Sequence, residues 1–260
     1  MKNLIVKSLR RFGYALNKIE NGPAFPPDIV EPAFRDLFEA CKPYTMTSVE
    51  RLYALYQSVH YVIQNKVPGD FVECGVWKGG SAMLIARILQ QSGVKDRKIY
   101  LYDTYEGMSE PSEADADFKG KSASALLNTA SKEDQASVWC YAPYEEVFNN
   151  MVKTGIDPKN IAMVKGKVEE TIPAEMPESG IALLRLDTDW YESTLHELNH
   201  LFPRLSPSGV LIVDDYGHWQ GCRKAVDEYF EKNNINLLLN RIDYTGRVGI
   251  KGAPNRDNFS

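Results

Sequence analysis

The chain has 260 residues, of which 43% are hydrophobic and 25% are charged, as is typical of a globular protein. Its formal net charge of -5 argues against a nucleic-acid-binding protein, because such proteins usually carry a basic stripe. No apolar run reaches the ~18 residues of a membrane span, so we expect no transmembrane segment. The cysteines are far apart and form no Cys-x-x-Cys pair, which predicts reduced thiols in a cytoplasmic protein; they are Cys41, Cys74, Cys140 and Cys222.

Residues 1–45 are expected to form an N-terminal, partly helical extension. Lys7, Arg10 and Arg11 interrupt its first apolar residues, so it lacks the apolar core of a signal peptide. This segment could be a basic amphipathic helix that contacts a membrane surface, or one that packs on its own domain or on another subunit. The segment contains several aromatic residues that could cover a neighbouring subunit and therefore favour a homo-oligomer: Phe12, Tyr14, Phe25 and Phe34.

From residue 46 to residue 260, helical and strand patterns alternate. Thr47 or Ser48 is placed to cap a helix that ends by Pro68-Gly69. Apolar runs predict strands at 70–75, 99–103, 161–164, 181–187 and 210–215, and helical spacing predicts helices at 82–89, 144–154, 191–202 and 221–232. Such alternation indicates an α/β fold with a doubly wound, mostly parallel sheet. Residues 236–251 predict a final antiparallel hairpin with Thr245-Gly246 in its turn.

One connection is unusually long. About forty residues separate Asp103 from the helix near Tyr144, whereas such connections usually have roughly 2–6 residues. The stretch 108–121 within it is acidic and contains proline and glycine. Long loops at the carboxyl ends of strands often bind or cover a substrate. We therefore expect a lid-like insertion at about 106–140, whose acidic part would close over a substrate.

A glycine-containing turn follows the first predicted strand, with the sequence ECGVWKGGS at 73–81. Glycine lets the backbone approach a ligand closely, and the N-terminus of the following helix offers free N–H groups. The pattern is typical of the nucleotide-binding turn of a doubly wound sheet, but it is not G-x-G-x-x-G, which disfavours a dinucleotide. Asp103, at the end of the next strand, is placed to accept hydrogen bonds from an adenosine ribose, a group that S-adenosylmethionine and NAD share.

Four aspartates follow two later strands. Asp187 and Asp189 come after one strand, and Asp214 and Asp215 come after the next. Carboxylates this close repel one another unless a cation neutralises them or some bind protons. Helix capping explains one aspartate at each strand end but explains four poorly. Oxygen ligands of this kind suit Mg²⁺, Ca²⁺ or Mn²⁺ rather than zinc, so the pattern predicts a metal site, which His218 could also face.

Seven segments in this order resemble the macrocin O-methyltransferase (TylF-like) family. They are TSVERLY (47–53), GDFVECGVW (69–77), YDTYEGM (102–108), WCYAP (139–143), GKVE (166–169), LDTD (186–189) and VDDYG (213–217). Members of that family methylate sugar hydroxyls with S-adenosylmethionine and a divalent metal, usually magnesium. The resemblance implies a Rossmann-like class I methyltransferase whose acceptor is a small-molecule hydroxyl, that of a sugar in a glycosylated natural product or a polysaccharide precursor.

The resemblance also implies roles by position. The metal ligands would be Asp187, Asp214 and Asp215, and the general base would be Asp189. The residues expected to contact S-adenosylmethionine are Thr47, Ser48, Glu73, Gly75, Ser81, Asp103, Gly166 and Lys167. Of these, Glu73, Gly75 and Ser81 would line its methionine part.

Three other functions are compatible with parts of the pattern. A catechol-type methyltransferase would use similar metal chemistry on aromatic diols, and the acceptor pocket would decide between the two. An NAD-dependent dehydrogenase is disfavoured because the G-x-G-x-x-G motif is missing. A cofactor-binding protein without catalytic activity is disfavoured because both aspartate pairs are complete.

Overall fold

The computed structural model describes residues 25–132, 134 and 137–252. The chain divides into two compact units, Met1–Val30 and Glu31–Ser260, and the second contains the sheet and every helix named here. The amphipathic helix predicted at the N-terminus, with Phe12 and Tyr14, lies outside the described residues.

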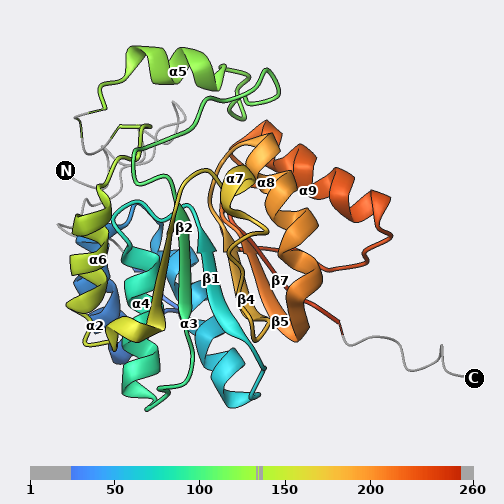
Figure 1. Cartoon of the computed structure of the whole chain (residues 1–260). Coiled ribbons are helices and arrows are strands. Elements are labelled where there is room, and N and C mark those ends of the chain that lie inside the picture. Colours follow the sequence, from blue (N-terminus) through green and yellow to red (C-terminus); the bar gives the residue numbers. More distant parts are fainter. Residues whose placement is uncertain (1–24, 133, 135–136, 253–260) are drawn as a thin grey trace, which may run out of the picture. The chain divides into compact units, whose positions relative to one another are not determined.

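The second unit is built around a seven-stranded sheet with the order β3-β2-β1-β4-β5-β7-β6 (Figure 1). The first five strands are parallel, and β7 runs antiparallel to both of its neighbours. This arrangement confirms the doubly wound, mostly parallel sheet and the C-terminal hairpin. The strands are β1 (Asp70–Cys74), β2 (Ile99–Asp103), β3 (Ile161–Lys165), β4 (Ile181–Leu186), β5 (Leu205–Val213), β6 (Asn240–Arg241) and β7 (Arg247–Ile250).

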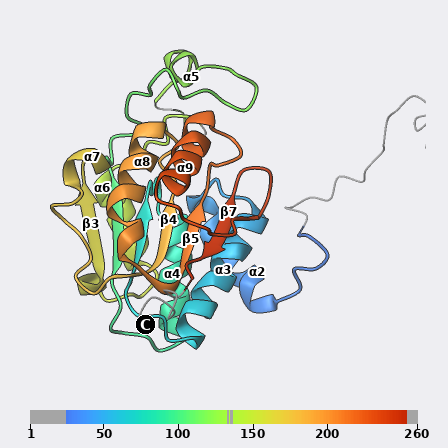
Figure 2. The ribbon, with the colours of Figure 1, turned by 90° about the vertical axis from the view of Figure 1, so that its right-hand side faces the viewer.

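Helices cover both faces of the sheet, as Figures 1 and 2 show. One layer contains α2 (Pro32–Cys41), α3 (Val49–Gln64), α4 (Gly80–Gln91) and α6 (Tyr144–Val152), and the other contains α7 (Val168–Thr171), α8 (Tyr191–His200) and α9 (Gln220–Lys232). Right-handed crossovers place the helices on opposite faces, because the strand order advances in opposite directions from β1 and from β4. All residues of β1 and β4 are buried, as expected for central parallel strands.

The observed elements differ from the predicted ones mainly in their ends. Ser48, rather than Thr47, caps α3, since its hydroxyl oxygen accepts a hydrogen bond from the backbone N–H of Arg51 at 3.1 Å. β5 begins at Leu205, five residues before the predicted start, because Leu205 already pairs with Ile181 ahead of an irregularity in register. The sequence did not predict α5 (Ala123–Thr129) or α7, which are too short to display helical periodicity.

The last part of the N-terminal extension packs on the domain. Helix α2 contacts α3 and α4. The Phe34 side chain has no exposed surface, and its ring centroid lies 5.0 Å from that of Tyr53 and 5.3 Å from that of Tyr56. The expectation that Phe34 covers a neighbouring subunit is therefore wrong, because this ring is part of the chain's own core.

The long connection between β2 and α6 lies over the carboxyl ends of the central strands, and its helix α5 is at the top of Figure 1. The Asp115 carboxylate accepts a hydrogen bond from the backbone N–H of Tyr191 at 2.8 Å. The indole of Trp190 donates to the carbonyl of Ser109 at 3.1 Å. These bonds attach the connection to the start of α8, beside the predicted aspartate cluster.

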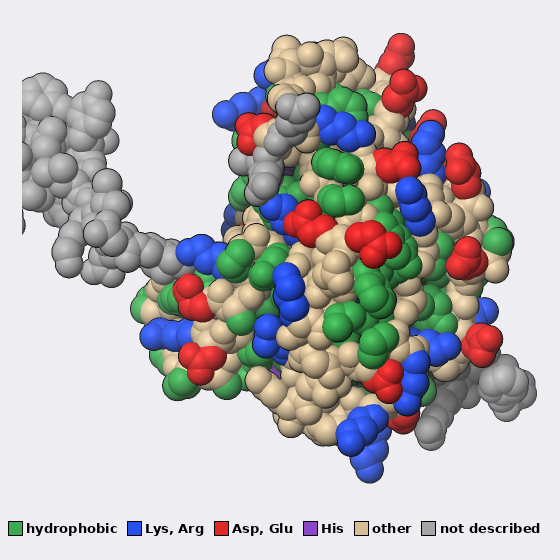
Figure 3. Space-filling view, turned by 60° about the vertical axis from the view of Figure 1, so that its left-hand side comes forward, with side chains coloured by type: hydrophobic (Ala, Val, Ile, Leu, Met, Phe, Trp, Pro, Cys, Tyr) green, Lys and Arg blue, Asp and Glu red, His purple; other side chains and the backbone are tan. Residues whose placement is uncertain are grey.

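The surface carries both signs of charge. On the face shown in Figure 3, acidic and basic side chains are interspersed among apolar ones. Among the described residues, no helix has both the length and the apolar character needed to cross a membrane. All four cysteines are unpaired thiols.

Candidate active site

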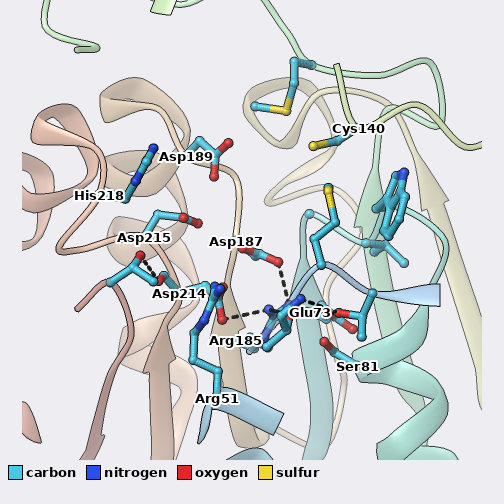
Figure 4. A pocket seen from close by; sticks show the side chains of 18 of the residues that line it. Arg51, Glu73, Ser81, Cys140, Arg185, Asp187, Asp189, Asp214, Asp215 and His218 are labelled. Carbon is cyan, nitrogen blue, oxygen red and sulfur yellow. Dashed lines mark hydrogen bonds and ion pairs between the residues drawn. The ribbon is translucent and has the colours of Figure 1, made fainter. Parts of the chain in front are cut away.

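A cavity of about 400 Å³ opens at the carboxyl ends of β1, β2, β4 and β5 (Figure 4). A smaller cavity of about 60 Å³ shares part of its wall and extends to the end of β3. Of the predicted site residues, the larger cavity is lined by Thr47, Glu73, Gly75, Ser81, Asp103, Asp187, Asp189, Asp214 and Asp215. Gly166 and Lys167 line the smaller one. Residues from five strand ends thus meet in one place.

The turn after β1 has little room for side chains. Gly75 has a φ of +81°, and a Cβ added there would lie 2.0 Å from the backbone oxygen of Asp187. Gly79, with a φ of +86°, precedes the first turn of α4, where Ser81 is buried against the cavity. The glycine at position 75 is therefore required by the close approach of the β4 end, in addition to any ligand.

Glu73 lies at the bottom of the cavity and is 1% exposed. One of its carboxylate oxygens accepts a hydrogen bond from Arg185 at 2.5 Å, and the other has no partner among the described residues. Burial raises the pKa of Glu73 to about 7, although the positive charge of Arg185 opposes the shift. A buried carboxylate oxygen without a donor fits a cationic ligand group such as the ammonium of a bound amino acid.

Asp103 organises the neighbouring loop. One carboxylate oxygen accepts from the backbone N–H groups of Val76 at 2.7 Å and Trp77 at 3.2 Å, and the other accepts from that of Tyr105 at 2.6 Å. Burial raises the pKa of Asp103, and these hydrogen bonds oppose the shift. Since two carboxylate oxygens offer about four acceptor positions, Asp103 can still accept a ribose hydroxyl. The backbone N–H of Gly166 donates to the carbonyl of Asp103 at 3.0 Å, and Asp103 lines both cavities.

Thr47 and Ser48, both predicted to approach the cofactor from the N-terminal side, differ in their position relative to the cavity. Thr47 lines the cavity, and its hydroxyl lies 3.3 Å from a guanidinium nitrogen of Arg185. Ser48 is not among the lining residues, because its hydroxyl caps α3 and donates to Asp243 at 2.8 Å. The structure therefore brings Thr47, but not Ser48, to the predicted cofactor position.

Three aspartates form a compact acidic group. Each of Asp187, Asp214 and Asp215 offers one carboxylate oxygen, and these oxygens lie within 4.8 Å of one another. A buried oxygen of Asp215 has no hydrogen-bond partner among the described residues. Hard oxygen donors at this separation fit a divalent cation such as Mg²⁺.

Two arginines that the sequence analysis missed lie beside this group. Arg185, within β4, contacts Asp187 and Asp214 at 2.8 Å each, and Arg51 of α3 forms an ion pair with Asp214. An arginine inside an otherwise apolar strand was a usable signal, because a buried guanidinium requires carboxylate partners.

The charges in the cavity do not balance. The described residues that line it include the three carboxylates of the acidic group and those of Glu73 and Asp189. The same lining contributes two guanidinium groups, those of Arg51 and Arg185. Burial raises the pKa of Asp187 and Asp215; the charge of Arg185 opposes the shift at Asp187, and neighbouring carboxylates add to it at both. Bound protons or a divalent cation must supply the missing positive charge.

Asp189 lies at the edge of the acidic group and lines the cavity (Figure 4). Its φ of +70° is in the left-handed region, as are the values of 46° at Trp77 and 45° at Cys140, which line the same cavity. Such backbone strain is concentrated at functional sites in proteins. Burial raises the pKa of Asp189 to about 7, with hydrogen bonding to Asp215 opposing the shift.

Three aromatic side chains from different segments contact one another, and two of them, His218 and Tyr244, line the larger cavity. His218, which follows β5, lies 3.0 Å from the hydroxyl of Tyr244 in the C-terminal hairpin. The ring of Phe118, from the long connection, lies 5.5 Å from that of His218. Burial lowers the pKa of His218, which favours the neutral imidazole, and the charge of Asp117 opposes the shift.

Comparisons with known proteins agree with this geometry. Residues 37–248 match the family model described as Macrocin-O-methyltransferase (TylF). An 8-demethyl-8-(2,3-dimethoxy-alpha-L-rhamnosyl)-tetracenomycin-C 4'-O-methyltransferase of Streptomyces olivaceus is 34% identical over 78% of this chain and 74% of that protein. A demethyldecarbamoylnovobiocin O-methyltransferase of Streptomyces niveus is 36% identical over the same shares.

A solved structure extends the likeness to three dimensions. The O-methyltransferase NovP superposes with a TM-score of 0.69 at 33% identity, over 81% of this chain and 83% of that one. The chain therefore belongs to the macrocin-O-methyltransferase (TylF) family and is an O-methyltransferase with the class I methyltransferase fold.

Proposed function

We propose that this enzyme transfers a methyl group from S-adenosylmethionine to a sugar hydroxyl of a glycosylated small molecule or polysaccharide precursor, with the help of Mg²⁺. The observation that carries this proposal is the shared cavity, in which the turn after β1 and the acidic group line the same space. The name of the Streptomyces olivaceus relative, which contains a rhamnosyl group, supports a sugar as the acceptor.

The cofactor would lie along the ends of β1, β2 and β3. The free oxygen of Glu73 would accept a hydrogen bond from the ammonium of the methionine part, beside Ser81. Asp103 would accept from the ribose, and Gly166 and Lys167 line the adjoining space for the adenine. Thr47 would close the site from the N-terminal side of α3.

Asp187, Asp214 and Asp215 would hold the cation. A bound divalent cation lowers the pKa of an oxygen that approaches it, which makes a sugar hydroxyl a better nucleophile. Arg51 and Arg185 keep the carboxylate of Asp214 in place from two sides.

Asp189 would be the general base. Its strained turn holds the carboxylate next to the acidic group, and a pKa near the working pH suits proton transfer from a hydroxyl. Asp189 would accept the hydroxyl proton, and S-adenosylmethionine would supply the methyl group that the acceptor oxygen takes. The products would be a methyl ether, S-adenosylhomocysteine and protonated Asp189, which would then lose its proton to solvent. The long connection over the site would exclude water during transfer.

Calorimetry tests the cofactor part of this proposal. S-adenosylmethionine and NAD are titrated separately into the full chain, each with Mg²⁺ and with EDTA. We expect binding of S-adenosylmethionine and none of NAD, because the turn after β1 lacks the dinucleotide pattern. In Glu73→Gln the affinity for S-adenosylmethionine should fall, on the order of tenfold for the loss of one charged hydrogen bond. Binding of NAD in preference to S-adenosylmethionine would overturn the proposal.

A further inference from the structure

Arg185 connects two groups of residues that have different proposed roles. Its side chain is 2% exposed, and its guanidinium contacts carboxylates at the ends of three neighbouring strands (Figure 4). The distances are 2.5 Å to Glu73, 2.8 Å to Asp187 and 2.8 Å to Asp214. Glu73 belongs to the proposed cofactor site, and the two aspartates belong to the proposed cation site.

One nitrogen of the guanidinium contacts a carboxylate of each proposed site. Nη1 lies within bonding distance of both Glu73 and Asp187, and Nη2 donates to Asp214. The guanidinium is planar, and its N–H groups point in fixed directions. A shift of Glu73 therefore disturbs the donor that also holds Asp187.

We propose that Arg185 is a positioning residue shared by the two binding sites. It orients Glu73 toward the ammonium of the cofactor, and it orients Asp187 and Asp214 toward the divalent cation. This inference rests on the proposed function, because it assumes that both ligands bind in this cavity.

Arg51 provides a matched comparison. It also forms an ion pair with Asp214, from the opposite side, and it is partly accessible. Its other partners are Asp243, at 3.2 Å, and the hydroxyl of Ser48, at 3.4 Å, and neither lines the cavity. Arg51 therefore supports the cation side alone, whereas Arg185 supports both sides.

The test measures the two ligands separately on the full chain and on the variants Arg185→Lys and Arg51→Lys. S-adenosylhomocysteine is titrated calorimetrically in EDTA, and Mn²⁺ binding is followed by the electron paramagnetic resonance signal of the free ion. Lysine keeps the charge, but its compact ammonium cannot hold three carboxylates in fixed directions. We expect Arg185→Lys to weaken both ligands on the order of 10–100-fold. Arg51→Lys should weaken Mn²⁺ by a similar factor and leave S-adenosylhomocysteine within about twofold.

A second pair of variants keeps the test decisive if Arg185→Lys does not fold. Glu73→Gln removes a negative charge near the proposed cation site and one of the three carboxylates that orient Arg185, so Mn²⁺ binding should weaken on the order of threefold to tenfold. Asp103 also belongs to the proposed cofactor site, but its carboxylate does not contact Arg185. Asp103→Asn should therefore weaken the binding of S-adenosylhomocysteine and leave the binding of Mn²⁺ unchanged.

Two results would overturn the inference while leaving the proposed function intact. One is that Arg185→Lys weakens the binding of S-adenosylhomocysteine or of Mn²⁺ but not of both. The other is that Glu73→Gln and Asp103→Asn bind Mn²⁺ with equal affinity. If the parent protein binds neither S-adenosylhomocysteine nor Mn²⁺, the proposed function itself fails, and the inference fails with it.

Discussion

The replacement Asp189→Asn removes the proposed base and keeps the size of the side chain. Without a cation, a pKa of about 7 makes Asp189 roughly one-tenth ionised at pH 6 and nine-tenths ionised at pH 8, and this roughly ninefold difference is the upper limit for the rise in turnover over the interval. A bound cation favours ionisation and would move the midpoint below 7. Loss of a general base costs about 10²–10⁴-fold in rate. We therefore expect a fall in kcat of this size, with little change in the KM for the acceptor.

The assay follows S-adenosylhomocysteine release between pH 5.5 and 9 at saturating Mg²⁺, in the parent and in Asp189→Asn. The parent should show a rising limb with a midpoint at or below pH 7, and the variant should lose that limb. Calorimetry with S-adenosylhomocysteine controls for intact cofactor binding. If the variant keeps both the rate and the pH limb of the parent, Asp189 is not the base.

Three further outcomes follow from the same geometry. Asp214→Asn should abolish Mg²⁺-dependent turnover while calorimetry still detects S-adenosylhomocysteine binding; turnover that persists in EDTA would remove the metal from the account. Because burial raises the pKa values of Asp187, Asp189 and Asp215, the metal-free folded state holds protons that the unfolded chain has lost. Stability present at low pH is therefore lost as the pH rises through these raised pKa values, which for Asp189 is about 7. Solvent reaches these groups through the cavity, so we expect the free energy of unfolding to fall by about 1–2 kcal/mol between pH 5 and 8, and Mg²⁺ to restore it at pH 8. A melting temperature independent of pH and Mg²⁺ would contradict this. Gly75→Ala should lower the free energy of unfolding by about 3 kcal/mol, because its Cβ would overlap the backbone of Asp187; an unchanged melting temperature would refute the close approach.

The sequence predicted the sheet well because its signals are local. A run of apolar residues marks each strand, and the segments between these runs show the periodicity of helices. Glycine or proline marks the ends of these elements. The aspartates at 187, 189, 214 and 215 could be placed together because parallel strands end at one edge of a sheet. The five predicted parallel strands and the C-terminal hairpin are present in the structure.

Other features depend on contacts between distant parts of the chain, which no local pattern encodes. The pairing of Arg51 with Asp214 joins residues 163 positions apart, and Ser48 leaves the cofactor side because Asp243 of the C-terminal hairpin accepts its hydroxyl. Arg185 was treated as one residue of an apolar strand, although its burial requires several acidic partners. The burial of Phe34 in the chain's own core was not predictable locally, because two of its aromatic partners, Tyr53 and Tyr56, follow more than fifteen residues later, in α3.

The most direct test of the central claim is a methyl-transfer assay with labelled S-adenosylmethionine. The acceptors are glycosides with vicinal hydroxyls, with simple catechols as a parallel series, and each reaction is run in EDTA and in EDTA with excess Mg²⁺. We predict transfer of the label to a sugar hydroxyl that requires Mg²⁺ and disappears in Asp189→Asn. Transfer to glycosides at the same rate in EDTA, or transfer to catechols alone, would contradict the account.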